Sequence, residues 1–288
     1  MKKWNLIVHV GRCINCRNCA IADRDEHVGN DFPGYAASAS PSSESTIRIL
    51  RRDRGSAPMV DTTFLPVMCN HCDDAPCLRV GGDAVRKRDD GIVVVDPVAA
   101  RGRRDIAEAC PYGAIVWDDE HDRPQAWIFD AHLLDQGWTR PRCAQVCPTD
   151  VFEAVALDDA AMTLRARRDG LQVLRPELGT RPRVWYRDLD RWEVDFVGGS
   201  VAVETETGID CVADARVTLH RDAGEIAEVR SDAFGDFRFD GLRLGGDEIE
   251  ISVDHPLGVA RLAVRATESV NLGEIRLRPA GADRGGER

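Results

Sequence analysis

Ten cysteines dominate the chemistry available to this sequence of 288 residues, and nine of them precede residue 148. The first group, Cys13-x2-Cys16-x2-Cys19, is a short loop that can direct three thiolates to one centre, as around a cubane iron–sulfur cluster. In two-cluster ferredoxins the fourth thiolate comes from a remote Cys-Pro pair. Cys147-Pro148 fits that role. We therefore predict a [4Fe–4S] cluster held by Cys13, Cys16, Cys19 and Cys147.

A second group repeats this pattern as Cys69-x2-Cys72-x4-Cys77, and Cys110-Pro111 supplies its remote Cys-Pro. The ligand count closes at eight, which predicts a second [4Fe–4S] cluster on Cys69, Cys72, Cys77 and Cys110. Zinc is the alternative, but zinc sites favour two separated Cys-x2-Cys pairs over a triplet with a remote Cys-Pro. A catalytic cysteine would be one isolated thiol beside a base, whereas these are grouped. We expect no catalytic residue in the chain.

The segment that carries these groups, residues 1–195, contains short apolar stretches and few long helical patterns. Residues 92–97 are typical of a short strand, and residues 106–110 of a helical turn that ends at a proline. Residues 158–170 form the longest expected helix, which ends at a glycine. We predict a bis-ferredoxin-like cluster domain over 1–195.

From Gly198 onward, apolar residues alternate with a period of two, which predicts about seven short antiparallel strands. The alternating residues are Val201 and Val203, Val217 and Leu219, Phe237 and Phe239, Ile249, Ile251 and Val253, Leu262 and Val264, and Ile275 and Leu277. Residues 232–237 favour a hairpin turn. We predict an α+β chain, with a transthyretin-like or immunoglobulin-like antiparallel β-sandwich over 196–280 and a disordered tail over 281–288.

Charge and hydropathy exclude several functions. The net charge of −11 is opposite to that of a nucleic-acid-binding protein. No apolar run approaches the roughly 20 residues of a membrane span, and the run at residues 6–10 is too short for a signal-peptide core. We therefore expect a cytoplasmic protein with no membrane span. In a reducing compartment, clustered cysteines indicate metal ligands more than disulfides.

At the cysteine groups and several shorter motifs, the sequence resembles the iron–sulfur subunits of pyrogallol–phloroglucinol transhydroxylases, within the dimethyl sulfoxide reductase superfamily. The motifs are Cys13-Ile-Asn-Cys16-Arg-Asn-Cys19, Asp25-Glu26-His27, Pro33-Gly34-Tyr35, Cys69-Asn-His-Cys72 through Ala75-Pro76-Cys77, Asp90-Gly91-Ile92-Val93, Cys110-Pro-Tyr-Gly113, Ala131-His132-Leu133-Leu134 and Pro176-Glu-Leu-Gly-Thr180. The resemblance extends over nearly the whole chain, including the terminal sandwich.

This resemblance implies a partner: a large catalytic subunit that binds the molybdopterin cofactor and acts on a phenolic compound, while the present chain transfers electrons through its clusters. Resorcinol hydroxylase and other molybdenum reductases have small subunits that fit equally, so they remain alternatives. A different alternative is a structural scaffold whose clusters carry no electrons.

Four-cluster members of the superfamily have two further ligand sets, and both depart from the pattern here. The first set falls on Gly81, Ala100, Arg103 and Ile106, so that site is absent, as in the transhydroxylase subunit. The second set falls on Asp23, Trp127, Asp130 and Cys143, of which only one is a cysteine. We therefore predict that this family cluster is absent too. Cys143 is then expected to be a buried thiol that fills the vacated space with Trp127. The alternative is another metal held by Asp23, Asp130 and Cys143.

The remaining candidate residues, one cysteine, three histidines and a run of arginines, each have a structural interpretation as well as a functional one. Cys211 has no neighbouring cysteine and is expected to be a small hydrophobic residue in the sandwich. His71, inside the second cysteine loop, either raises the cluster potential through a hydrogen bond to sulfur or bonds only to backbone. His27 and His132 also attract a ligand interpretation, but we expect packing or a subunit interface at His132. The run 101–104 (Arg-Gly-Arg-Arg) is typical of a solvated charged segment, with docking to an acidic partner as the alternative.

Overall fold

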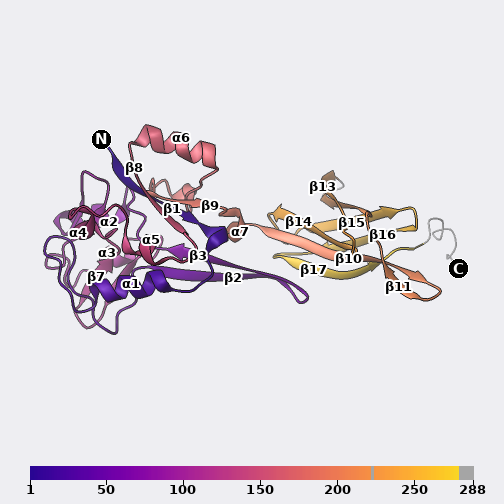
Figure 1. The fold of residues 1–288 in the computed structure, drawn as a ribbon, viewed down its shortest axis with the longest axis horizontal. Helices are drawn as coiled ribbons and strands as arrows, with labels where there is room; N and C mark the ends of the chain where they lie inside the picture. The colour runs from indigo at the N-terminus through magenta and orange to yellow at the C-terminus, as the bar shows by residue number, and fades with distance from the viewer. Residues whose placement is uncertain (222–223, 279–288) are drawn as a thin grey trace. The chain divides into compact units, whose positions relative to one another are not determined.

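The computed structural model describes residues 1–221 and 224–278, which form two compact units (Figure 1). The first unit comprises Met1–Arg51 and Thr63–Trp192. The second comprises Arg52–Thr62 and the chain from Glu193 onward. The segment 52–62 therefore belongs with the second unit, whereas the sequence placed it in the first. The predicted tail, 281–288, lies outside the described residues.

A three-stranded sheet of order β8-β1-β9 anchors the first unit. Its central strand, β1 (Lys3–His9), pairs antiparallel with β8 (Phe152–Leu157) and parallel with β9 (Val184–Arg187). Both faces of β1 are covered. Leu6 points into the main core, and its neighbour Ile7 points to the other face and packs against Met162 of α6 (Asp159–Asp169). The predicted helix over 158–170 is thus confirmed, with Asp158 as its N-cap and Gly170 as its C-cap.

The rest of the first unit consists of short elements joined by loops, as expected of a chain that folds around grouped ligands. The short helices are η1 (Val10–Arg12), α1 (Asn18–His27), α2 (Pro76–Gly81), η2 (Gly82–Ala84), α3 (Arg104–Glu108), α4 (Ala131–Leu134), α5 (Arg142–Val146), η3 (Pro176–Leu178) and α7 (Asp190–Glu193). Two small hairpins are β4 (Val85–Lys87) with β5 (Val93–Val95), and β6 (Ile115–Asp118) with β7 (Arg123–Ala126).

The second unit contains two four-stranded sheets. In one, β10 (Asp195–Thr205) pairs with β11 (Gly208–Cys211), β14 (Asp236–Leu242) and β17 (Val270–Arg276). The other has the order β13-β12-β15-β16, formed by β13 (Gly224–Arg230), β12 (Arg216–Arg221), β15 (Glu248–His255) and β16 (Gly258–Arg265). The alternating residues of β12, β14 and β15 are buried in one shared core. With the short helices of the first unit, the chain is α+β.

Three expectations for this unit are wrong. The strands do not all pair antiparallel as predicted, because β17 pairs parallel with β10. The turn at residues 232–237 does not close a hairpin, because β13 pairs with β12 whereas β14 pairs with β10, so the turn carries the chain between sheets. Cys211 is exposed and does not pack as a small hydrophobic residue. It ends β11, all four residues of which are exposed.

A long hairpin, β2 (Arg48–Ser56) and β3 (Met59–Val67), has its ends in the first unit and its outer part in the second. Within the second unit, Arg54 donates to the carbonyl of Val194 at 2.8 Å and pairs with Asp61. Arg52 pairs with Asp195 at 2.7 Å. The Arg52–Asp195 pair joins the hairpin to β10, and Arg54 joins it to the residue just before that strand. No helix among residues 1–221 and 224–278 has the length and apolar character of a membrane-crossing helix.

Candidate metal centres

The first thiol group consists of Cys13, Cys16, Cys19 and Cys147. Cys13 directly follows η1, and Cys19 lies in the first turn of α1. Cys147 ends α5, which packs beside α1. The four sulfurs lie close enough for Cys19 to interact electrostatically with the other three. The structure therefore brings the predicted triplet and its remote Cys-Pro to one place.

The second thiol group consists of Cys69, Cys72, Cys77 and Cys110. Cys69 and Cys72 lie on the loop before α2, Cys77 is in α2, and Cys110 follows α3. Cys69 interacts electrostatically with the other three thiols, and Cys77 with Cys110 and Cys72. All ten cysteines of the chain are free thiols, so none of these eight is committed to a disulfide.

The two groups share a local backbone geometry. In the first Cys-x2-Cys loop of each group, the residue before the second cysteine has a left-handed backbone, with φ of 57° at Asn15 and 46° at His71. In each Cys-Pro segment, the backbone N–H four residues after the cysteine donates to its sulfur at 3.4 Å, from Ala114 in one and from Val151 in the other. Both groups thus present a ring of thiols with backbone N–H groups turned toward sulfur.

Burial makes the thiols of Cys19, Cys72 and Cys77 poor acids when no cation is beside them. It raises the pKa of Cys19 to about 12, with the neighbouring thiols adding to the effect. Burial also raises the pKa of Cys72 and Cys77 to about 11 each. Iron that binds such sulfurs holds them as thiolates, because coordination displaces the proton. Each group combines buried and partly exposed thiols, with a backbone N–H donor on the sulfur of its Cys-Pro cysteine, and such a donor set fits a [4Fe–4S] cluster.

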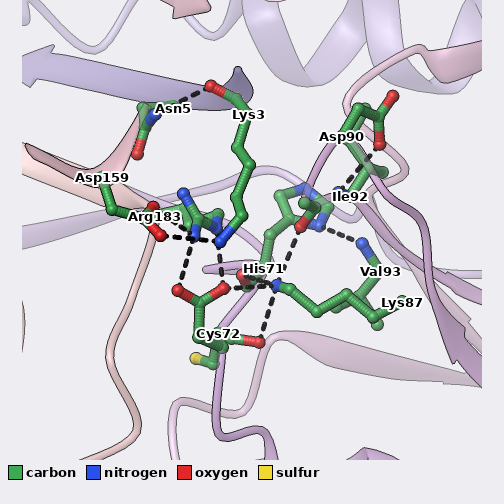
Figure 2. A network of polar contacts seen from close by, with 12 residues as sticks. Lys3, Asn5, His71, Cys72, Lys87, Asp90, Ile92, Val93, Asp159 and Arg183 are labelled. Carbon is green, nitrogen blue, oxygen red and sulfur yellow. Dashed lines mark hydrogen bonds and ion pairs between the residues drawn. The ribbon is translucent and has the colours of Figure 1, made fainter. Parts of the chain in front are cut away.

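A polar network supports the loop of Cys69 and Cys72 (Figure 2). The Lys87 ammonium donates to the carbonyls of His71 at 2.8 Å, Cys72 at 2.9 Å and Gly91 at 2.9 Å. It also pairs with Asp73 at 3.0 Å. Lys87 ends β4, and so the β4–β5 hairpin places a cation beneath the second thiol group. No sequence motif marks this lysine, and Asp90-Gly91 at the hairpin tip was the only signal near it.

The network continues away from the thiols through buried Arg183. Its guanidinium contacts both carboxylate oxygens of Asp73 and pairs with Asp159 at 2.9 Å. Asp159 in turn accepts from Lys3 at 2.8 Å. Figure 2 labels Lys3, Asp159 and Arg183 of this network, together with His71 and Cys72 of the loop. The network thus connects the cysteine loop to the start of α6 and to β1.

Thr180 connects the two parts of the second thiol group. Its hydroxyl lies 2.6 Å from the Tyr112 hydroxyl, two residues beyond Cys110, and it hydrogen-bonds to the Cys72 sulfur. Backbone N–H groups of Asp73 and Asp74 donate to the 180–181 segment, which fixes that segment to the loop. Thr180 is the last residue of the motif Pro176-Glu-Leu-Gly-Thr180, which was one of those that carry the family resemblance.

The four residues at the position that the sequence predicts to be vacated, Asp23, Trp127, Asp130 and Cys143, are all buried. Asp23 accepts three hydrogen bonds, from the Thr46 backbone at 2.8 Å, the Thr46 hydroxyl at 2.7 Å and the Ser45 hydroxyl at 2.8 Å. Asp130 accepts from the Arg142 backbone at 2.7 Å. Cys143 interacts electrostatically with both carboxylates and with Cys19. The carboxylates therefore act as acceptors for backbone and hydroxyl donors.

Trp127 occupies the start of this vacated loop and joins it to the second thiol group. Its ring stacks on Phe129 with centroids 4.8 Å apart and lies 5.4 Å from the His71 ring. Phe129 has a φ of 58°, which is strained for an aromatic residue and matches the left-handed position of the two cysteine loops. Among the described residues, no three or more His, Cys, Asp or Glu side chains are grouped to hold a single metal ion.

The histidine candidates bond within the protein. The backbone N–H of Val93 donates to His71 Nδ1 at 3.0 Å, so this nitrogen is an acceptor and has no proton to give to sulfur. Burial lowers the pKa of His71 to about 3. His132 contacts Glu26 at 2.8 Å and stacks on Phe32, which is packing between α4 and the α1 region. Burial also lowers the pKa of His27.

The arginine run at 101–104 lies on the surface. Arg103 pairs with Asp105, and Arg104 pairs with Asp119 and lies over the Trp117 ring. These local partners agree with a solvated charged segment.

Known proteins share these features. The model of the 4Fe-4S dicluster domain family matches residues 60–156. The small subunit of pyrogallol hydroxytransferase from Pelobacter acidigallici is 37% identical over 280 residues, which cover 96% of this chain and 100% of the relative. The chain belongs to this family of iron–sulfur subunits.

Other iron–sulfur subunits of the same superfamily match about two thirds of the chain. A tetrathionate reductase subunit from Salmonella typhimurium is 32% identical over 193 residues, which cover 65% of this chain and 73% of the relative. The arsenate respiratory reductase iron–sulfur subunit from a Shewanella species is 25% identical, over 64% of this chain and 95% of the relative. The family and its domain assign [4Fe–4S] clusters as the cofactor class of this iron–sulfur subunit.

Proposed function

We propose that this chain is the electron-transfer subunit of a molybdopterin oxidoreductase that acts on a phenolic compound. The observation that carries the proposal is the 37% identity to the pyrogallol hydroxytransferase small subunit over essentially both full lengths. The convergence of eight free cysteines into two groups of four supports it. The class of substrate is inferred from the name of that relative.

We propose two [4Fe–4S] clusters, one on each thiol group, with the following ligands. The first has Cys13, Cys16, Cys19 and Cys147, and the second has Cys69, Cys72, Cys77 and Cys110. Such clusters supply one-electron transfer without a substrate site. The chain's own contribution is to hold the thiolates, to donate N–H groups to sulfur at Cys110 and Cys147, and to keep Cys19 and Cys69 buried.

The third family position is proposed to hold no cluster. Three of its four ligands are replaced, at Asp23, Trp127 and Asp130, and both aspartates accept hydrogen bonds from neighbouring residues. Cys143 is proposed to be a packing residue at this position, since it is 1% exposed. A single remaining thiol cannot anchor a four-iron cluster.

The catalytic partner is proposed to be a large molybdopterin-binding subunit, in a cytoplasmic complex. The two domains have separate roles in this proposal: the first unit carries the clusters, and the second is a sandwich of the transthyretin or immunoglobulin type. Obligate interfaces commonly bury over roughly 2,000 Å². The isolated chain is therefore expected to have no conversion activity and to lose iron readily.

The first test is composition. The tagged chain, purified anaerobically from its native host, should copurify with a large molybdopterin-binding chain. Reconstituted alone, it should hold about 8 iron and no zinc per polypeptide. About 12 iron would refute the vacated position, and stoichiometric zinc would refute the cluster assignment.

The second test separates electron transfer from a scaffold role. The complex is reduced with dithionite, and its clusters are followed by electron paramagnetic resonance after addition of a trihydroxybenzene or resorcinol. Reoxidation of the reduced clusters at the rate of turnover supports electron transfer. Turnover with clusters that stay in one redox state supports the scaffold, and turnover by the small chain alone would defeat the proposal.

A further inference from the structure

We propose that the Lys87 ammonium is a fixed positive charge that raises the reduction potential of the cluster at the second thiol group. The inference rests on the proposed assignment of Cys69, Cys72, Cys77 and Cys110 as cluster ligands. In this inference Lys87, a residue outside the cysteine motifs, makes the reduction potential of the second cluster differ from that of the first.

Four oxygen acceptors hold the Lys87 ammonium in place. Three carbonyl oxygens, from His71, Cys72 and Gly91, accept from the ammonium within 2.9 Å, and Asp73 pairs with it at 3.0 Å. Two of those carbonyls belong to the Cys69–Cys72 loop itself. The ammonium therefore cannot swing into solvent without breaking hydrogen bonds that shape the loop.

The charge of Lys87 reaches the sulfurs of this group. It interacts electrostatically with Cys69 and with Cys72, favouring the thiolate at Cys72. The lysine side chain is only 20% exposed, so solvent and salt screen its charge weakly. Reduction adds one negative charge to the cluster, and a cation at this place stabilises the reduced form more than the oxidised form.

Asp73 provides the opposite sign at nearly the same place. Its carboxylate pairs with Lys87 and Arg183, which hold its pKa below the ordinary value against the effect of burial. If charge sets the potential, removal of the cation and removal of the anion must act in opposite directions. If the network only supports the loop, both changes weaken the site in the same way. This difference in sign distinguishes electrostatics from structure.

The experiment is a potentiometric titration of the reconstituted full chain, followed by electron paramagnetic resonance. Wild type is compared with Lys87→Gln, Lys87→Met, Lys87→Arg and Asp73→Asn, with iron measured for each protein. The wave of the second cluster is identified as the signal that Cys77→Ser alters. We expect Lys87→Gln and Lys87→Met to lower the reduced-to-oxidised ratio of this cluster at fixed potential about tenfold, which is about 59 mV.

The same titration should move the wave upward in Asp73→Asn and leave it near wild type in Lys87→Arg. The matched control is Lys3→Met, which removes a lysine from the same network at its far end, where the partner is Asp159. This control should leave both waves in place. The wave of the first cluster should stay in place in every variant.

Three results would overturn the inference. One is an unshifted second wave in Lys87→Gln with full iron content. Another is a shift of the same sign in Lys87→Gln and Asp73→Asn. The third is loss of the cluster from both neutral lysine variants together with an unshifted wave in Asp73→Asn. A wild-type chain without [4Fe–4S] signals would instead refute the proposed function, so the two failures are distinguishable.

Discussion

The carboxylate of Asp130 accepts a 2.7 Å hydrogen bond from the backbone N–H of Arg142, the first residue of α5. The residue before that helix is Pro141, whose side chain has no acceptor, and α5 has no side-chain cap of its own. Asp130 therefore serves as its acceptor from 12 positions away. Because α5 leads directly to Cys147, Asp130 helps to place a cysteine that we propose as a ligand of the first cluster.

This arrangement predicts a pH dependence at Asp130. Burial raises its pKa from 3.8 to about 7. Between pH 4 and 7 the folded chain thus holds a proton that the unfolded chain has lost, so the free energy of unfolding falls as the pH rises through this window. We expect Asp130→Asn to remove up to roughly 4 kcal/mol of this fall.

Chemical denaturation of the reconstituted chain at a series of pH values checks this expectation. The stability of wild type relative to Asp130→Asn should decrease steadily from pH 4 to 7. Asp119→Asn, at an exposed carboxylate paired with Arg104, serves as the control and should run parallel to wild type. Parallel curves for Asp130→Asn as well would contradict the assignment.

Cysteine replacements should report the membership of each thiol group. Cys77→Ser and Cys110→Ser are expected to have the same effect on the second cluster, because both serve it although they are far apart in sequence. Cys143→Ser should leave the iron content of the reconstituted chain almost unchanged. Iron analysis and electron paramagnetic resonance provide the measurement. A cluster lost from Cys143→Ser but retained in Cys147→Ser would refute the assignment of Cys147 to the first cluster.

The vacated position should accept a cluster again when its ligands are restored. In the triple variant Asp23→Cys, Trp127→Cys and Asp130→Cys, the new thiols join Cys143, and the left-handed backbone at Phe129 is already that of a cysteine loop. We expect about 4 more iron per chain after reconstitution. The same variant with Cys143→Ser added is the control and should gain less. An unchanged iron content in the triple variant would show that this loop no longer has the geometry of a cluster site.

The longest helix of the first unit should depend on its cap. The Asp158 carboxylate accepts from the Ala161 backbone N–H at 2.8 Å, and so Asp158→Ala is expected to cost about 1 kcal/mol of stability. Leu164→Ala on the same helix is the control, since this side chain is 67% exposed and its loss should change stability by under about 0.5 kcal/mol. Thermal unfolding of the two variants under the same conditions is the measurement. Equal losses of stability in both would contradict a capping role for Asp158.

Local spacing predicted much of this molecule because its patterns are short-range. The two cysteine triplets, the capped helix that ends at Gly170 and the alternation in β12, β14 and β15 each depend on residues within a few positions of one another. Such patterns identify an element before its neighbours are known. The family resemblance then supplied the partner class, which no local pattern contains.

Long-range pairing was the part that the sequence could not provide. The turn at 232–237 has the composition of a hairpin, yet which strands pair is decided by the two sheets, and β14 joins β10. Lys87 looks like any surface lysine until the β4–β5 hairpin places it under the His71 and Cys72 carbonyls. The exposure of Cys211 likewise depends on the end of β11, where the sheet offers no cover.

Because the β2–β3 hairpin contributes residues 52–62, the second unit is built from two segments that are far apart in the sequence. A fragment that starts at residue 193 lacks Arg54 and Asp61, and with them the contacts of that pair to Val194 and Arg238. Conversely, a protein truncated after residue 192 retains segment 52–62 without the strands to which it belongs. Neither fragment therefore contains a complete unit. A circularly permuted or fused version would have to retain the β2–β3 hairpin, residues 48–67, along with the chain on both sides of residue 193.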